Sequence, residues 1–158
     1  MTWSLTVTDI TSLRGYVEFL ADVQKKNCRG EKISPAEWLL AHGRDFLVGP
    51  RTFAGRRMKM KECFRNAAQR ALRDPGLAYA EGYVHAVIPI EHAWLVDKDG
   101  CVVDPTLRNG DGRVQNYFGV AIRTSYLMKT LSRNKCYGVL GYWNWEHVLK
   151  DATEEILP

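Results

Sequence analysis

The chain has 158 residues, the usual length of one domain whose core needs no metal or disulfide support. Apolar residues make up 46% and charged residues 25%, and no low-complexity tract or repeat is present, so a fibrous, repeat or disordered protein is excluded. A formal net charge of +4 does not by itself predict a nucleic-acid partner. We expect a single domain over residues 1–158.

The N-terminus has no basic segment followed by an apolar one, and the chain has no run of about 18 apolar residues. We therefore expect a cytoplasmic protein without a membrane span. The cysteines lie far apart and form no C-x-x-C pair, which argues against structural zinc and disulfides; they are Cys28, Cys63, Cys101 and Cys136. Free thiols, no metal and no cofactor are expected. The oligomeric state is not indicated.

Two helices are predicted in the first 42 residues. Apolar residues spaced three or four apart follow Thr11 or Ser12, either of which can cap a helix that ends between residues 27 and 30. In "SPAEWLL", Ser34 is the predicted N-cap, proline follows it, and a glutamate completes a capping box. This second helix extends to about His42.

The stretch "MKMKECFRNAAQRALRDPG", residues 58–76, predicts a third helix with Cys63 in its first turn. Its apolar stripe is rich in alanine, which lets a helix lie close against a sheet. The approach to the helix is basic and contains Arg56, Arg57, Lys59 and Lys61. A helix N-terminus and nearby cations both favour a thiolate, so Cys63 is a candidate nucleophile.

Beyond Pro75 the chain becomes rich in aromatic and β-branched residues. Strands are predicted at about residues 83–88, 91–97 and 100–104. A short strand or loop in "VQNYFGVAI", a helix over 124–132, a strand in "CYGVLGY" and a closing helix in "NWEHVLKDATEEIL", capped by Asn144, complete the prediction. The order predicts an α+β fold in which an N-terminal helical lobe packs on a small antiparallel sheet.

The segment "HAWLVDKDGCVVDPT" predicts a hairpin with a defined register. If residues 98–100 form a type I turn closed by a left-handed glycine, Asp97 pairs with Cys101. His92 and Asp104 then project from the same face as diagonal neighbours, about 7 to 8 Å apart at the backbone. A two-residue loop would place them on opposite faces, but the glycine at the last loop position favours the first register.

Cys63, His92 and Asp104 occur in the order and on the elements that a thiol triad requires. The thiolate would attack, the imidazole would exchange the proton, and the carboxylate would fix the tautomer and stabilise the imidazolium. Two of the three residues also have a simpler interpretation. Cys63 could be an inert core thiol, and Asp104 could only begin a turn that Pro105 fixes.

The segments "ECFRNA", "EHAW" and "VVDPT", within residues 61–106, resemble the transglutaminase-like and arylamine-acetyltransferase-like branch of the papain-like cysteine enzymes. Small uncharacterised bacterial and phage-type proteins carry similar "C-x-N-A", "EGY", "HAW" and "DPT" segments. The resemblance implies a papain-like or transglutaminase-like fold. It also implies a catalytic triad of Cys63, His92 and Asp104 that acts on an amide, ester or thioester.

One departure concerns the oxyanion hole. Papain-type proteases have a glutamine shortly before the cysteine, whereas this chain has "RRMKMKE" there. The backbone N–H of Cys63 is one candidate donor, because the first amides of a helix lack partners within it. The side chains considered for the second donor are Trp38, Asn66, Gln115 and Asn116.

The expected function is that of a thiol-dependent hydrolase or acyltransferase, acting on a peptide, isopeptide or side-chain amide through an acyl-enzyme on Cys63. Its partner would be a protein or peptide substrate, or a small amide. A groove above the thiol is expected to be lined by Trp38, Trp94, Tyr117 and Trp143.

The sequence also allows two other functions. A non-catalytic binding module with the same fold could contact nucleic acid or another anionic partner through the basic segment 51–73. That segment lacks the interleaved aromatic residues of nucleic-acid-binding motifs, so nucleic acid is not the expected partner. A metal site would join His85, His92 and Asp104, with or without Cys63, but no short-spaced ligand pair supports it.

Overall fold

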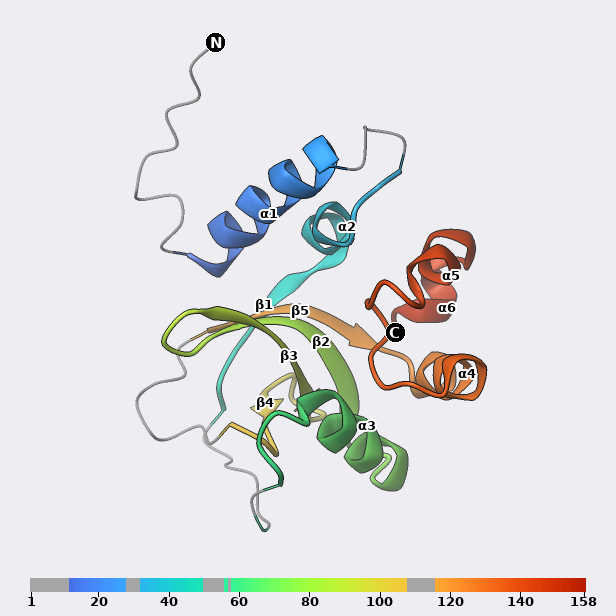
Figure 1. Ribbon diagram of the computed structural model, residues 1–158. Helices are drawn as coiled ribbons and strands as arrows, with labels where there is room; N and C mark the ends of the chain where they lie inside the picture. Colours follow the sequence, from blue (N-terminus) through green and yellow to red (C-terminus); the bar gives the residue numbers. More distant parts are fainter. Residues whose placement is uncertain (1–11, 28–31, 50–55, 57, 108–115) are drawn as a thin grey trace.

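The computed structural model describes residues 12–27, 32–49, 56, 58–107 and 116–158. These form an α+β fold around one curled antiparallel sheet with strand order β1-β5-β2-β3-β4 (Figure 1). The strands are β1 (Arg44–Phe46), β2 (Ala78–His85), β3 (Pro89–Val96), β4 (Val102–Val103) and β5 (Asn116–Ile122). The coarse fold class is therefore the predicted one.

Six helices are present in the described part of the chain. They are α1 (Leu13–Asn27), α2 (Pro35–His42), α3 (Cys63–Arg73), α4 (Thr124–Asn134), α5 (Trp145–Lys150) and α6 (Thr153–Ile156). In Figure 1, α1 and α2 lie together above the sheet, α3 lies below it, and α4 to α6 gather at the right. None of these helices is long and apolar enough to cross a membrane.

The two N-terminal helices begin where their capping residues predict. The Ser12 hydroxyl accepts a hydrogen bond from the backbone N–H of Gly15 at 3.0 Å. At α2 the full capping box forms, because Ser34 Oγ accepts from the Glu37 N–H at 3.2 Å and the Glu37 carboxylate accepts from the Ser34 N–H at 2.9 Å. Both predicted helices are confirmed.

Both faces of the sheet are buried. One face packs against the helices in the main hydrophobic cluster, and the other forms a second cluster. The strand residues of the second cluster are Phe46, Ala80, Val84, Trp94, Val96, Val102 and Tyr117. Neighbouring residues of β2 and β3 belong to opposite clusters because side chains alternate along a strand.

Helix α3 lies close to the sheet and carries Cys63 as its first residue. Ala67, Ala68 and Ala71 are all buried in the main cluster, so their small side chains allow the close packing that the sequence predicts. The chain turns sharply just before the helix, where Lys61 adopts a left-handed conformation with φ of 65°. No side chain caps the start of α3, which leaves its first N–H groups available to other partners.

The register of the β3–β4 hairpin is the predicted one. Leu95 pairs with Val103, and the Asp97 N–H donates to the Cys101 carbonyl at 3.0 Å. Gly100 is left-handed with φ of 80°, as the three-residue loop requires. Strand β4 ends one residue before Asp104, which therefore lies beside the same hairpin.

The predicted strand in "CYGVLGY" is wrong, because residues 136–142 form turns and bends. Two left-handed residues redirect the chain, Lys135 with φ of 58° and Gly138 with φ of 100°. The N–H groups of Val139 and Leu140 donate to the Glu81 carboxylate instead of to a neighbouring strand. The Glu81 side chain therefore satisfies backbone N–H groups that would otherwise need a neighbouring strand.

The predicted closing helix is divided into α5 and α6, which are separated by Asp151 and Ala152. Asn144 precedes α5 but makes no side-chain cap. Its amide donates to the Val139 carbonyl at 2.8 Å and its oxygen accepts from Asn134 at 2.9 Å. Strand β1, which has three residues, was not predicted.

Replacing Gly100 tests the hairpin register. Gly100→Ala should lower the free energy of unfolding by about 1 to 2 kcal/mol, since an L-residue in the left-handed region carries that cost. A Cβ at this position would meet nothing within 4 Å, so backbone strain alone is measured. Gly100→Asn is the control and should lose less, because asparagine tolerates this conformation. Equal stability of Gly100→Ala and the wild type in urea would contradict the assignment.

Candidate active site

The structure brings Cys63, His92 and Asp104 together from three elements. Cys63 begins α3, His92 lies within β3, and Asp104 follows β4. His92 Nε2 lies 2.6 Å from Asp104 Oδ2, and the Cys63 thiol is hydrogen-bonded to the His92 side chain. Since Nε2 is engaged by the carboxylate, Nδ1 is the ring nitrogen left for the thiol. The hairpin register thus leads to the contact predicted from it.

Asp104 is held on both of its carboxylate oxygens. Oδ1 accepts from the N–H groups of Thr106 at 2.7 Å and Leu107 at 2.8 Å, as an aspartate does when it begins a turn. Oδ2 accepts from the Tyr117 hydroxyl at 2.9 Å and contacts His92. The side chain is 0% exposed. Asp104 therefore stabilises its turn with one oxygen and orients the imidazole with the other.

The surroundings of His92 favour its charged form. Burial alone would lower the pKa of His92, but its hydrogen bonds to Asp104 and Cys63 and the charges of both raise that pKa to about 9. The imidazole side chain is only 3% exposed. At neutral pH it is therefore an imidazolium between two acidic groups.

Cys63 is the half-buried member of the three. Burial raises the pKa of its thiol, but the hydrogen bond and charge of His92 and the N–H groups of Ala93 and Phe64 outweigh burial and lower it. The Phe64 N–H belongs to the uncapped start of α3. Within the described residues, β4 pairs only with Leu95 and Val96 of β3, which leaves the Ala93 N–H for the sulfur.

The basic residues before α3 contribute less to the lowered pKa of Cys63 than the sequence predicted. The largest contributions that lower the pKa of Cys63 come from His92 and the two backbone amides. Lys59 and Arg65 instead form ion pairs with Glu62, at 2.7 Å and 3.4 Å. Residues 51–55 and 57 of the basic segment lie outside the described residues.

Asn66 joins the cysteine segment to the aspartate turn and was missed as a structural residue of the site. Its amide nitrogen Nδ2 donates one hydrogen to the Lys59 carbonyl at 2.8 Å and the other to Thr106 Oγ1 at 2.9 Å. Because both amide hydrogens are engaged, Asn66 is not free to act as the oxyanion donor considered above. A buried polar residue on the alanine-rich stripe, one turn after Cys63, is the signal that could have identified it.

The proposed groove residues have different surroundings. Trp94 and Tyr117 are fully buried in the second cluster, and the Tyr117 hydroxyl contacts Asp104 rather than a surface where a substrate could bind. Trp38 is buried and packs against His42 and Trp145. Of the four aromatic residues, only Trp143 lines the cavity described next.

Asn116 is exposed at the start of β5. Gln115 and Cys28 lie outside the described residues.

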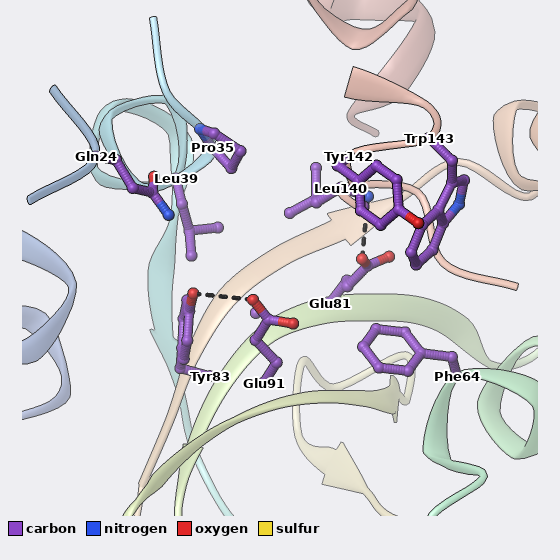
Figure 2. Close-up of a pocket in the computed structure, with 12 residues that line it drawn as sticks. Gln24, Pro35, Leu39, Phe64, Glu81, Tyr83, Glu91, Leu140, Tyr142 and Trp143 are labelled. Carbon is purple, nitrogen blue, oxygen red and sulfur yellow. Dashed lines mark hydrogen bonds between the residues drawn. The ribbon is translucent and has the colours of Figure 1, made fainter. Parts of the chain in front are cut away.

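A cavity of about 270 Å³ lies over β2 and β3 beside the start of α3 (Figure 2). Its walls come from α1, α2, Phe64 and the loop after α4. The lining residues are Gln24, Pro35, Leu39, Phe64, Glu81, Gly82, Tyr83, Glu91, Leu140, Gly141, Tyr142 and Trp143. Phe64 follows Cys63 directly, so the cavity adjoins the segment that carries the thiol.

Glu81 is a buried carboxyl that the sequence interpretation missed. It is 5% exposed and accepts hydrogen bonds from the Tyr79 hydroxyl at 2.9 Å and from the N–H groups of Val139 at 2.7 Å and Leu140 at 3.0 Å. Burial raises the pKa of Glu81 to about 7, although these hydrogen bonds oppose the shift. A glutamate inside the apolar run "AYAEGYV" is the signal that could have identified it.

The described residues contain no group of three or more His, Cys, Asp or Glu arranged to hold a metal ion. His85, one of the ligands considered, ends β2 and pairs with Pro89 and Asn116 in the sheet.

No family model, curated protein or solved structure matches this chain.

Alkylation tests whether Cys63 is an activated thiol. Iodoacetamide at pH 6 should modify Cys63 roughly tenfold or more faster than Cys136, because only Cys63 has an imidazolium partner. Cys136 is the more exposed thiol, so it controls for access. His92→Ala should slow the reaction at Cys63 alone, as measured by peptide mass analysis. Faster labelling of Cys136, or labelling of Cys63 that ignores His92→Ala, would contradict the assignment.

The buried carboxyl predicts a pH dependence of stability. The pKa of Glu81 is about 7 in the folded state against 4.5 as its ordinary value, so the folded state binds more protons between these values. The free energy of unfolding should fall by about 3 kcal/mol as pH rises through this window. Glu81→Gln should remove this contribution in urea titrations from pH 5 to 8 and leave the part of the fall that comes from His92. Glu154→Gln, on α6, is the control, and identical profiles for Glu81→Gln and wild type would refute the assignment.

Proposed function

We propose that the chain is a thiol-dependent hydrolase or acyltransferase that forms an acyl-enzyme on Cys63. The hydrogen-bonded series Cys63, His92, Asp104 carries this proposal, because only its first member reaches the surface. A thiolate paired with a buried imidazolium is a nucleophile and a proton donor in one site. Structural cysteines in apolar surroundings have their pKa raised, whereas that of Cys63 is lowered.

The reaction would follow from these contacts. Cys63 Sγ forms a bond to the carbonyl carbon of an amide, ester or thioester, and the carbonyl oxygen takes the negative charge. His92 then gives its Nδ1 proton to the leaving group as the bond from the carbonyl carbon to that group breaks. Water or an amine attacks the thioester next, His92 takes up the released proton, and the Cys63 thiolate is restored.

Backbone amides are suited to stabilise the developing charge. The Cys63 N–H is the first of α3 and lacks an intrahelical partner. The helix dipole adds a partial positive charge at the same point. The unpaired N–H and the helix dipole together support the start of α3 as one of the groups that would bind the oxyanion.

The helix-borne cysteine beside a strand histidine also supports a papain-like or transglutaminase-like fold for the chain. A protein, a peptide or a small amide is the proposed substrate. The competing proposal is a binding module that keeps this geometry without turnover. The acylation experiment described next separates the two proposals.

Acyl transfer can be tested with a chromogenic thioester or activated ester and mass analysis of the protein. An acyl adduct should appear on Cys63 and be absent in Cys63→Ala. Asp104→Asn should lower the acylation rate at pH 7 by about 10² to 10⁴, because the amide no longer stabilises the imidazolium. Tyr117→Phe is the matched control: it removes one hydrogen bond to Asp104 and should have a much smaller effect. No adduct on wild-type Cys63, or an Asp104→Asn rate equal to wild type, would favour the binding module.

A further inference from the structure

We propose that the cavity next to the Cys63 segment binds a positively charged side chain of the substrate. This side chain, an ammonium or guanidinium group, would belong to the residue that supplies the scissile carbonyl. This inference rests on the proposed function, since it assigns a specificity subsite to the same thiol. It names the class of substrate that the sequence left open.

The size and position of the cavity suit one side chain. Its volume of about 270 Å³ is below the range of about 300 to 1,000 Å³ typical of sites for drug-sized ligands. Phe64 forms one wall and is the residue after the thiol. The opposite wall comes from Gln24 on α1 and Leu39 on α2, and Figure 2 shows the two glutamates between these walls.

The loop after α4 forms the part of the cavity wall next to Phe64. A Cβ added at Gly138 would lie 3.5 Å from the Phe64 ring and 3.8 Å from Glu81 Oε1, so the loop is seated directly against both. Glu81 fixes this loop through the N–H groups of Val139 and Leu140. The wall is therefore preorganised by a carboxylate that belongs to the cavity itself.

The cavity carboxylate is also held from within the core. The buried Tyr79 hydroxyl donates to Glu81 at 2.9 Å.

The lining is negative and aromatic. Glu81 and Glu91 contribute two carboxyl groups, and no residue among those described as lining the cavity carries a positive charge. The Tyr83 hydroxyl donates to Glu91 at 3.3 Å and orients it. The charge of Glu91 adds to the rise in the pKa of Glu81. A cation between these groups would relieve their repulsion.

Aromatic rings surround the same space. Phe64, Tyr83, Tyr142 and Trp143 line the cavity, and Trp143 is 43% exposed, so part of its indole is open to solvent. Cations bind favourably over aromatic faces, most strongly over tryptophan. Carboxylates with aromatic walls favour a cation over a neutral side chain of the same length, and they reject an anion.

The test compares Nα-acetylated thioesters of lysine, norleucine and glutamate, which share a backbone. Acylation of wild-type Cys63 should show a kcat/KM for lysine roughly tenfold above that for norleucine, and higher still against glutamate. Glu91→Gln should bring the lysine and norleucine values close together. Glu154→Gln on α6 is the matched control and should leave their ratio unchanged. Glu91 is exposed, so its replacement does not disturb the core.

A binding measurement separates this inference from the proposed function. Cys63→Ala is titrated with Nα-acetyl-lysine amide and Nα-acetyl-norleucine amide by calorimetry. Preferential binding of lysine amide without any acylation in the wild type would support the cavity and overturn the enzyme. Acylation of the wild type with equal kcat/KM for lysine and norleucine would support the enzyme and overturn the cavity. A lysine preference that survives Glu91→Gln would also overturn the cavity as assigned.

Discussion

The contact between His92 and Asp104 is the interaction on which the site depends. Both side chains are almost fully removed from water, and a buried charge is tolerated only when it is paired and hydrogen-bonded. Leaving one partner of such a pair alone typically costs about 3 to 5 kcal/mol. The fold therefore has to supply every other contact of Asp104, and it does so with two backbone N–H groups and the Tyr117 hydroxyl.

The parts of the structure that depend on neighbouring residues could be predicted from the sequence. The capping box at Ser34 and the left-handed glycine in the β3–β4 loop are local signals with one favoured geometry. The length of the loop determined which residues of the two strands pair. That pairing placed His92 and Asp104 on the same face of the hairpin. A site residue pair was thus inferred from a turn, without knowledge of the rest of the sheet.

The parts that depend on distant residues could not be predicted. The segment after α4 has the apolar pattern of a strand, but the Glu81 carboxylate, 58 residues earlier in the chain, binds its N–H groups. Trp94 and Tyr117 were expected in a groove because aromatic residues favour binding sites, yet the second face of the sheet needed large side chains to fill it. Residue type alone does not show which face of a curled sheet is covered.

The hydrogen bond from Asn66 to Thr106 joins residues that are 40 positions apart. Closing the loop between them carries an entropy cost, which the contacts of the folded chain offset. The partners that lower the pKa of Cys63 include His92 and the Ala93 N–H, which come from a strand distant in the sequence. The acidity of Cys63 is a property of the completed fold, and its reactivity reports native tertiary structure directly.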